Sequence, residues 1–322
     1  MTAKIIGTGS AVPSEKITND DLARFVDTSD EWISSRTGIK ERRLAKEETT
    51  TSLAVSAAGR ALEDAGIKPE EIELIVVATC SPDSFFPSTA CQVQAQIGAV
   101  NAVAFDLSAA CSGFLFALNT AQAYISGGIY EKALVIGAET LSKMLDWKDR
   151  STCVLFGDGA GAAVLRADEK GLLGMVQYSD GTKGKVLTCH ARRTRNIIAE
   201  GTQETDYLKM EGQEVFRFAV KKVPECIEKL LEKTETAKEE IKYYVLHQAN
   251  KRIIDSAAKR LKESEEKFPL NMNLYGNTSA ASIPILLDEI NRKGLLKKGD
   301  KIVLSGFGAG LTWGAALIEW QE

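Results

Sequence analysis

The sequence predicts an α/β protein made of two similar halves, and three pairs of segments support this. A charged helix end followed by an apolar strand occurs as "EEIELIVVATCSPD" from Glu70 and again as "EEIKYYVLHQAN" from Glu239. The strand-like segments "EKALVIGAET" from Glu131 and "DKIVLSGFGAG" from Asp300 keep the same spacing of 169 residues. A third pair is "GAGAAVLRAD" and "LTWGAALIEW". Two unrelated halves would rarely keep a common spacing, so the pattern indicates an internal repeat.

Within each half we expect the order helix, strand, helix, strand, strand. Apolar residues at helical spacing predict a helix over Ser52–Ala65, which Gly66 ends. Similar patterns predict helices over Val215–Lys233 and Ile283–Arg292. "LIVVAT" and "IVLSGF" are short continuous apolar strands, as expected in sheets covered on both faces. Layered helices and sheets of class α/β follow.

The expected boundaries divide the chain at one point. We assign residues 1–170 to the first half and 171–322 to the second. The segment from Met175 to Gly212 is polar and irregular, and we expect it to be an elaborated loop.

Composition restricts the class of protein. The 322 residues carry a formal net charge of −4, so no overall basic field exists to hold nucleic acid. No apolar run approaches the ~18 residues that a membrane span needs, and the N-terminus lacks the features of a signal peptide. The six cysteines have neither zinc-site nor disulfide-framework spacing. We therefore expect a cytoplasmic protein with reduced thiols and no metal.

Glycine-rich stretches leave two interpretations open. Gly7-x-Gly9 follows a strand but lacks the third glycine of a dinucleotide site, so tight packing is the better interpretation. Gly306, Gly308 and Gly310 lack the lysine of a phosphate-binding loop. They are interpreted either as a packed turn or as a turn that brings backbone N–H groups close to a substrate.

The repeat relates the positions of three polar residues to one another. A lone histidine such as His247 is more often structural than functional, and Asn277 alone suggests a turn or helix cap. The repeat, however, places Cys111 and Asn277 at equivalent strand-to-helix turns, and His247 at an equivalent strand end. Cys111 is expected to begin a helix, whose N-terminus would lower the pKa of the thiol. The other histidine, His190, is interpreted as a surface loop residue.

At these residues the chain resembles the β-ketoacyl-acyl-carrier-protein synthase III family, the condensing enzymes that start bacterial fatty-acid synthesis. The motifs include "DTSDEWISSRTGIKERR", "DLSAACSGF", "FGDGAGAAVL", "HQAN", "YGNTSAASIP" and "GFGAGLTWG", and they follow the family's order over essentially the whole chain. The resemblance implies a thiolase-like fold, with two βαβαβαββ halves in five αβαβα layers. It also implies a homodimer and no cofactor besides the substrates.

The resemblance also implies roles for individual residues. Cys111 matches the nucleophile that accepts the acyl group from a short acyl-CoA, most simply acetyl-CoA. His247 and Asn277 match the pair that binds the thioester carbonyl of malonyl-acyl carrier protein. The backbone N–H groups of Cys111 and Ala309 match the oxyanion hole, although many members have glycine at the second position. The implied reaction is a decarboxylative Claisen condensation through an acyl-Cys111 intermediate.

Further residues match binding sites of the family. The predicted coenzyme A site comprises Thr28, Trp32, Arg36, Arg150 and Arg252. The predicted acyl pocket contains Leu141, Phe156 and the loop near Leu187, with Phe86 reaching into the pocket of the partner subunit. Because the carrier protein is strongly acidic, a basic docking patch is expected from Arg217, Lys251, Arg252, Lys259 and Arg260. A solvated charged helix face explains any one of these basic residues equally well.

Other activities on the same fold are less consistent with the sequence. Elongating ketosynthases use two histidines, and thiolases use a second cysteine, whereas His190 lies in no matching motif. A member that uses a branched or longer acyl-CoA, or that serves secondary metabolism, remains an alternative. A non-catalytic acyl-CoA-binding dimer would be marked by loss of Cys111, His247 or Asn277, and all three are present.

Overall fold

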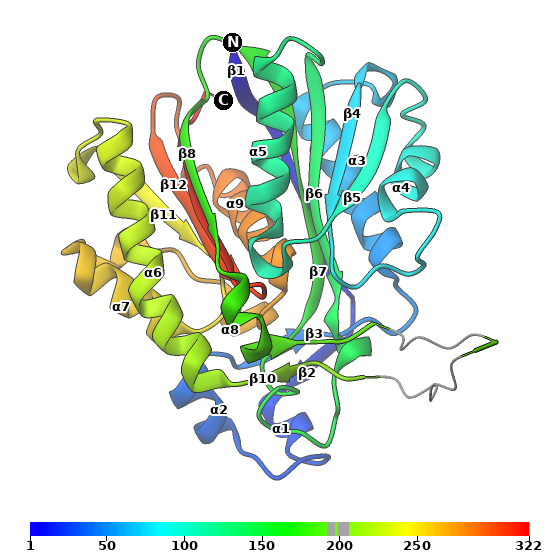
Figure 1. The fold of residues 1–322 in the computed structure, drawn as a ribbon, viewed down its shortest axis with the longest axis vertical. Helices are drawn as coiled ribbons and strands as arrows, with labels where there is room; N and C mark the ends of the chain where they lie inside the picture. Colours follow the sequence, from blue (N-terminus) through cyan, green and yellow to red (C-terminus); the bar gives the residue numbers. More distant parts are fainter. Residues whose placement is uncertain (192–196, 199–205, 322) are drawn as a thin grey trace.

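Two large β-sheets, with helices between them and on both outer faces, form the central part of the protein (Figure 1). The computed structural model describes residues 1–191, 197–198 and 206–321. The first sheet has the order β1-β7-β6-β4-β5, and the second has the order β11-β12-β13-β8. The α/β class predicted from the sequence is confirmed.

The first sheet comes from the first half of the chain. Its strands are β1 (Thr2–Ala11), β7 (Asp158–Asp168), β6 (Lys132–Thr140), β4 (Leu74–Ala78) and β5 (Val103–Leu107). β4 pairs in parallel with β5 and β6, and β7 is antiparallel to both β6 and β1. All five residues of β4 are buried, as expected for a continuous apolar strand with helices on both faces.

The second sheet follows the same plan with one strand fewer. Its strands are β11 (Ile241–Leu246), β12 (Lys301–Gly308), β13 (Thr312–Glu319) and β8 (Leu172–Ser179). Where the repeat would put a counterpart of β5, the chain forms the short helix α8 (Met272–Tyr275). Backbone N–H groups at its start are satisfied by the Gln248 side chain rather than by a neighbouring strand. The second half therefore departs from the predicted βαβαβαββ order at this point.

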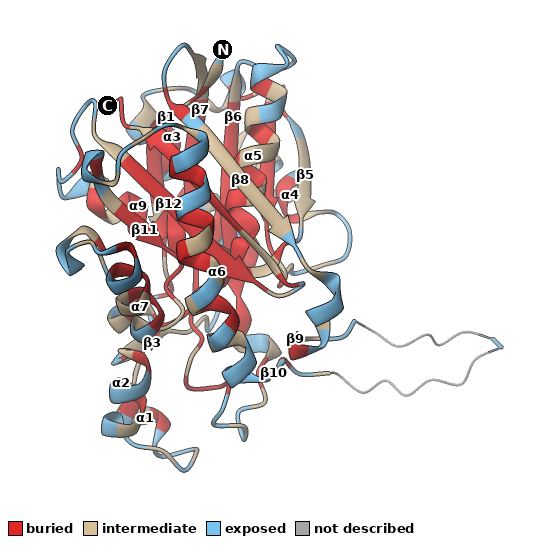
Figure 2. Ribbon diagram, turned by 60° about the vertical axis from the view of Figure 1, so that its left-hand side comes forward, coloured by how far each residue is buried: buried red, intermediate tan, exposed pale blue. Residues whose placement is uncertain are grey.

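Six helices cover the sheets. The helices α3 (Thr50–Ala65) and α4 (Thr89–Ile97) cover the outer face of the first sheet, and α6 (Gly212–Lys233) and α7 (Lys251–Leu261) cover that of the second. Between the sheets lie α5 (Gly113–Ser126) and α9 (Ser282–Arg292). Three separate apolar clusters fill the spaces between these layers, and Figure 2 shows the buried strands at their centre. The layers thus follow the order αβαβα.

The predicted helices agree closely with the observed ones. Their C-terminal ends, at Ala65, Lys233 and Arg292, match those of α3, α6 and α9, and Gly66 caps α3 in the left-handed conformation. Gly7 and Gly9 also pack as expected. A Cβ atom on either one would lie within 2.6 Å of a backbone atom of α3, which excludes any larger residue there.

The segment from Met175 to Gly212 is more ordered than predicted. Met175 to Ser179 belong to β8, which pairs with β13, and a 3₁₀ turn over Gly181–Val186 follows. The short strands β9 (Leu187–Thr188) and β10 (Lys209–Met210) then pair with each other. The expectation of a loop was wrong here because it missed the edge position beside β13. The rest of the predicted loop, at 192–196 and 199–205, lies outside the described residues.

A smaller lobe lies beside α7 at the lower end of the view in Figure 1. It contains the β2–β3 pair (Lys16–Thr18 and Glu41–Arg43) and the helices α1 (Asn19–Leu22) and α2 (Asp30–Thr37). Ser29 caps the start of α2 and Gly38 ends it. Among the described residues, none of the helices combines the length and the apolar character needed to cross a lipid bilayer.

The repeat is most exact at two tight turns. One 3₁₀ turn covers Ala110–Ser112 before α5, and the other covers Ser279–Ala281 before α9, 169 residues later. Ala110 and Ser279 both have a positive φ, of 46° and 50°. Cys111 lies within the first turn, whereas Asn277 precedes the second turn by two residues, so the exact counterpart of Cys111 is Ala280.

Candidate active site

Cys111 occupies a buried 3₁₀ turn directly before α5 and is 8% exposed. The end of β12 packs against it so tightly that a Cβ atom on Gly308 would lie 2.6 Å from the Cys111 backbone nitrogen. Gly308 thus permits a close approach of the β12 loop to the nucleophile turn. This is the tight packing of the first interpretation of the glycine-rich loop, and the second, in which backbone N–H groups approach a substrate, stays a prediction.

The electrostatics of Cys111 differ from the sequence prediction. Burial raises the pKa of the Cys111 thiol to about 12, a hydrogen bond with Ser279 lowers it, and the charge of Glu139 raises it. A lowered pKa was expected from the helix N-terminus alone, but the sequence did not reveal how deeply the thiol is buried. The resting residue is therefore a thiol, and its proton must be removed before it can attack.

His247 follows β11 directly and is also buried. Its Nδ1 lies 2.6 Å from the Ser282 hydroxyl, and its ring stands edge-on to Phe307 with centroids 5.3 Å apart. Burial lowers the pKa of His247 to about 3, so the imidazole is neutral at physiological pH. A neutral imidazole with Nδ1 accepting from Ser282 carries its hydrogen on Nε2 and can donate it.

Asn277 is held by its backbone and by one side-chain oxygen. Its backbone N–H donates to the Leu155 carbonyl at 2.8 Å, and its carbonyl accepts from Gly157 at 3.0 Å. Its Oδ1 accepts from the Ser279 N–H at 2.9 Å. No acceptor for Nδ2 is found among the described residues, so this amide is the group left to donate to a ligand.

A cavity of about 580 Å³ joins these three residues to the surface. Its lining includes the buried Cys111, His247 and Asn277, together with Trp32, Arg36 and Arg252. The cavity thereby connects the predicted catalytic residues with three predicted coenzyme A residues. Apart from the pairs Trp32–Arg36 and His247–Arg252, these six residues lie far apart in sequence.

Two arginines flank Trp32. The guanidinium carbon of Arg36 lies 4.8 Å from the Trp32 ring centroid, and that of Arg150 lies 5.2 Å away. Arg150 also donates to the Asp27 carbonyl at 2.9 Å. Thr28 follows Asp27, and its buried Oγ1 has no partner among the described residues. Thr28 and Arg150 do not line the cavity itself, so their predicted contact with coenzyme A remains a prediction.

A second cavity, of about 590 Å³, is also lined by Cys111 and shares Phe156 and Leu187 with the first. Its apolar wall includes the predicted Leu141 and Phe156, together with Leu187, Met144 and Leu208. Ala309 lines it as well. The predicted Phe86 is 86% exposed and does not line the cavity of its own chain, whereas the neighbouring Phe85 does. Its predicted place in a partner subunit stays a prediction.

The predicted docking residues separate into two groups. Arg217 and Arg252 line the first cavity, and Arg252 and Lys259 share a surface hollow with Phe216. Three of the five are engaged in ion pairs: Arg217 with Glu214 at 2.5 Å, Lys251 with Asp255 at 2.7 Å and Arg260 with Glu225 at 3.3 Å. Arg252 and Lys259, which have no ion pair among the described residues, are therefore the better candidates for contacting a partner.

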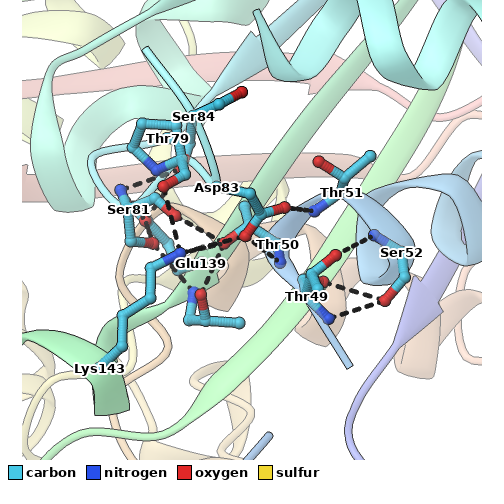
Figure 3. Close-up of polar contacts among 12 residues, drawn as sticks. Thr49, Thr50, Thr51, Ser52, Thr79, Ser81, Asp83, Ser84, Glu139 and Lys143 are labelled. Carbon is cyan, nitrogen blue, oxygen red and sulfur yellow. Dashed lines mark hydrogen bonds and ion pairs between the residues drawn. The ribbon is translucent and has the colours of Figure 1, made fainter. Parts of the chain in front are cut away.

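Sequence reasoning missed the polar residues behind the site. Gln248 fixes the loop that leads to Asn277, because its Oε1 accepts from the Asn271 N–H at 3.1 Å. Glu139, near the end of β6, accepts hydrogen bonds from the hydroxyls of Thr79 and Ser81 (Figure 3). The Ser279 hydroxyl donates to it as well. A glutamate inside the apolar strand "ALVIGAET" was the one available signal.

The chain matches two family models. Residues 105–181 match the model described as 3-oxoacyl-[acyl-carrier-protein] synthase III, and residues 231–320 match the model of its C-terminal part. Together they cover more than half of the chain.

Individual proteins are similar over nearly the full length. A β-ketoacyl-[acyl-carrier-protein] synthase III of Clostridium novyi is 55% identical, over 99% of each chain. The crystal structure of 3-oxoacyl-[acyl-carrier-protein] synthase III from Aquifex aeolicus has a TM-score of 0.92 and 48% identity, and covers 99% of this chain and 100% of that one. The priming β-ketosynthase of the R1128 polyketide pathway has a TM-score of 0.93 and 35% identity, over 99% and 97%.

Fold, site and comparisons together define a condensing acyltransferase. The chain belongs to the β-ketoacyl-acyl-carrier-protein synthase III family. Its reaction is the condensation that initiates type II fatty-acid synthesis.

Proposed function

We propose that the enzyme condenses a short acyl-CoA, most simply acetyl-CoA, with malonyl-acyl carrier protein through an acyl-Cys111 intermediate. The observation that carries this proposal is that two cavities meet at Cys111. The first leads from Trp32 at the surface and suits the pantetheine arm of a thioester. The second is apolar and suits the acyl chain.

In the first half-reaction the Cys111 sulfur attacks the thioester carbonyl, and coenzyme A leaves. The backbone N–H groups of Cys111 and Ala309 stabilise the tetrahedral oxyanion. The tight packing of Gly308 against Cys111 supports this assignment, because it brings the loop that carries Ala309 to the nucleophile turn.

In the second half-reaction His247 and Asn277 bind the malonyl thioester oxygen. The Nε2–H of the neutral His247 and the Nδ2 of Asn277 are the available donors, as the hydrogen bonds of Ser282 and Ser279 imply. They stabilise the enolate that forms as CO₂ departs. The carbanion then attacks the acyl-Cys111, which gives β-ketoacyl-acyl carrier protein.

Partners and organisation follow from the same proposal. Arg217 and Arg252 line the first cavity, and Lys259 shares a surface hollow with Arg252. These basic residues would attract an acidic carrier protein, although Asp255, Glu263 and Glu265 line the same hollow. A homodimer is supported by the exposed Phe86 and by β5, an edge strand whose Val103 is half-exposed.

The thiolase-like classification is supported by the αβαβα layers. A cytoplasmic location is supported by six unpaired cysteines.

A second candidate differs only in the primer. The cavity of about 590 Å³ behind Cys111 is much larger than a two-carbon group requires, which favours a branched or longer acyl-CoA. A partner's Phe86 would reduce this space. The similarity to a priming polyketide ketosynthase keeps secondary metabolism open as well.

The test is acyl transfer. The protein is incubated with radiolabelled acetyl-, isobutyryl- or octanoyl-CoA, and the Cys111 peptide is analysed for label. Malonyl-acyl carrier protein is then added and the β-keto product measured. Label on Cys111 followed by product supports the proposal, and the best primer decides between the candidates. The proposal fails if no primer labels Cys111.

A further inference from the structure

The Thr312 hydroxyl contacts both loops that carry the proposed oxyanion hole. Thr312 begins β13, directly after the turn that contains Ala309, and it lines the second cavity. Its Oγ1 lies 3.1 Å from the Ala309 carbonyl and 3.1 Å from the carbonyl of Ala109, which begins the nucleophile turn at Ala110–Ser112. The same oxygen lies 2.6 Å from the Ser112 hydroxyl. One side chain therefore joins two loops that lie 200 residues apart in the chain.

The hydrogens of the two hydroxyl groups fit a bridge between the loops. An oxygen–oxygen distance of 2.6 Å places one hydrogen between Ser112 and Thr312. When Ser112 supplies it, Thr312 keeps its own hydrogen for a carbonyl. The Ala109 carbonyl already accepts from the Ser112 N–H at 3.2 Å, whereas the Ala309 carbonyl has no other donor among the described residues. The Thr312 hydrogen is thus best used by Ala309.

Two backbone N–H groups beside this bridge are left without an acceptor. Over the described part of the chain, neither the N–H of Cys111 nor that of Ala309 donates to a backbone or side-chain oxygen. Both residues line the second cavity. Backbone N–H groups in a protein interior are nearly always paired, so two free donors at one cavity wall indicate an acceptor on a ligand. An acyl oxygen that becomes negative during the reaction is such an acceptor.

The position of the Ala309 N–H depends on what holds the loop on either side of it. On one side Gly308 packs against the Cys111 backbone nitrogen, and the strand pairing ends there with the Gly308–Thr312 pair. On the other side the Ala309 carbonyl is held by the Thr312 hydroxyl. No strand pairing holds Ala309 itself. The Thr312 hydrogen bond is therefore the contact that fixes this residue relative to the nucleophile turn.

We propose that Thr312 is a positioning residue for the oxyanion hole. Its hydroxyl ties the Ala309 loop to the nucleophile turn, so that the N–H groups of Ala309 and Cys111 converge on one oxygen of the acyl group. The inference rests on the proposed roles of Cys111 and Ala309. Thr312 gives no proton to the reaction and acts only through the backbone that it holds.

Thr312→Val tests this role because it removes the hydroxyl and keeps the shape of the side chain in the cavity wall. Misplacing a catalytic group by about 1 Å costs about 100-fold in rate. We expect single-turnover transfer of radiolabelled acetyl from saturating acetyl-CoA to Cys111 to be about 10- to 100-fold slower. The half-saturating concentration of acetyl-CoA should not change, because substrate binding does not use the oxyanion hole. Thr312→Ser keeps the hydroxyl and should retain most of the wild-type rate.

A second reaction of Cys111 shows whether the nucleophile itself is intact. In modification by methyl methanethiosulfonate, the thiol loses its proton to solvent, and its sulfur attacks the sulfenyl sulfur of the reagent and expels methanesulfinate. No carbonyl oxyanion forms in this step. The rate, measured on the Cys111 peptide by mass spectrometry, should be the same in the wild type and in both Thr312 variants. A merely structural disturbance of the nucleophile turn would change it.

Thr234→Val is the matched control. The Thr234 hydroxyl also contacts two backbone carbonyls, those of Leu230 at 2.9 Å and Leu231 at 3.3 Å, but it lies at the end of α6 and lines neither cavity. Its loss should alter neither reaction of Cys111. If circular dichroism shows that Thr312→Val does not fold, Thr312→Ala replaces it with the same expected results.

The combination of rates decides the question. Slow acetylation of the hydroxyl-free variant, with unchanged thiosulfonate modification and recovery in Thr312→Ser, supports the positioning role. Acetylation at the wild-type rate, equal losses in both reactions, or a Thr312→Ser variant as slow as Thr312→Val overturns it. A wild-type protein that takes up no acetyl label refutes the proposed function itself. A labelled wild type with an unaffected Thr312→Val variant refutes only the role of Thr312.

Discussion

The Ser282 hydroxyl lies 2.6 Å from Nδ1 of His247, and the tautomer of the ring decides which of the two groups donates. The Ser282 oxygen also accepts from the backbone N–H of Gln248 at 3.4 Å. A hydroxyl that accepts from Gln248 can direct its own hydrogen to Nδ1. In that tautomer the His247 hydrogen is on Nε2, on the side available to a substrate. At the repeat-equivalent position, Gly113 packs against Ala78, so only the second half carries this polar pair.

Ser282→Ala should slow condensation without affecting acylation. Loss of one hydrogen bond of about 1 kcal/mol frees the imidazole to adopt the other tautomer, so the condensation rate should fall about five- to tenfold. Transfer of labelled acetyl to Cys111 should be unchanged. Product formation and single-turnover acetylation measure the two steps, with Ser126→Ala on the exposed side of α5 as control. Equal losses in both steps would contradict this division.

Cys111→Ala and Asn277→Ala should separate the two half-reactions. The first variant has no nucleophile and should take up no acetyl label. The second retains the nucleophile and should be labelled normally, but its condensation should be about 100-fold slower or worse, as found when an oxyanion donor is removed. Cys91→Ala, at an exposed position on α4, is the control. Failure of Asn277→Ala to accept label would show that its role is not confined to the second step.

Much of the site could be predicted because it follows from the repeat. The spacing of 169 residues identified the turns of Cys111 and Asn277 and the strand end of His247 without any knowledge of contacts. The first cavity then joins these residues to Trp32 and Arg36, as the resemblance implied.

The parts that could not be predicted depend on tertiary burial. The pKa of Cys111 was expected to fall, because the sequence reveals a helix N-terminus but not the desolvation that opposes it. Glu139 and Ser279 are 140 residues apart, and nothing in either segment indicates that they meet. The absence of a strand equivalent to β5 could not be predicted either. At that place the N–H groups at the start of α8 donate to the Gln248 side chain, a contact that the sequence does not reveal.

Trp32→Ala should weaken the binding of acyl-CoA selectively. The indole ring, which lies close to the guanidinium groups of Arg36 and Arg150, offers an aromatic surface on which a base can stack. Loss of such a stacking contact is worth about 1–2 kcal/mol. The KM for acetyl-CoA should therefore rise roughly five- to thirtyfold, while the KM for malonyl-acyl carrier protein changes little. Trp32→Phe retains an aromatic face and should show a smaller increase. A similar rise in both KM values would argue against a coenzyme A role.

His247 should make the protein less stable as the pH falls below neutrality. Burial lowers its pKa to about 3, whereas the unfolded residue titrates near 6.5, so between these values the unfolded state binds one more proton. The free energy of unfolding should thus fall, through this residue alone, by about 2 kcal/mol between pH 7 and pH 5. Urea unfolding of His247→Gln should lack this part of the loss, whereas His190→Gln, at an exposed position, should follow the wild type. If all three proteins lose the same stability, His247 binds a proton in the folded state as readily as in the unfolded state. The proposed role of neutral His247 as a hydrogen-bond donor in the condensation step would then be wrong.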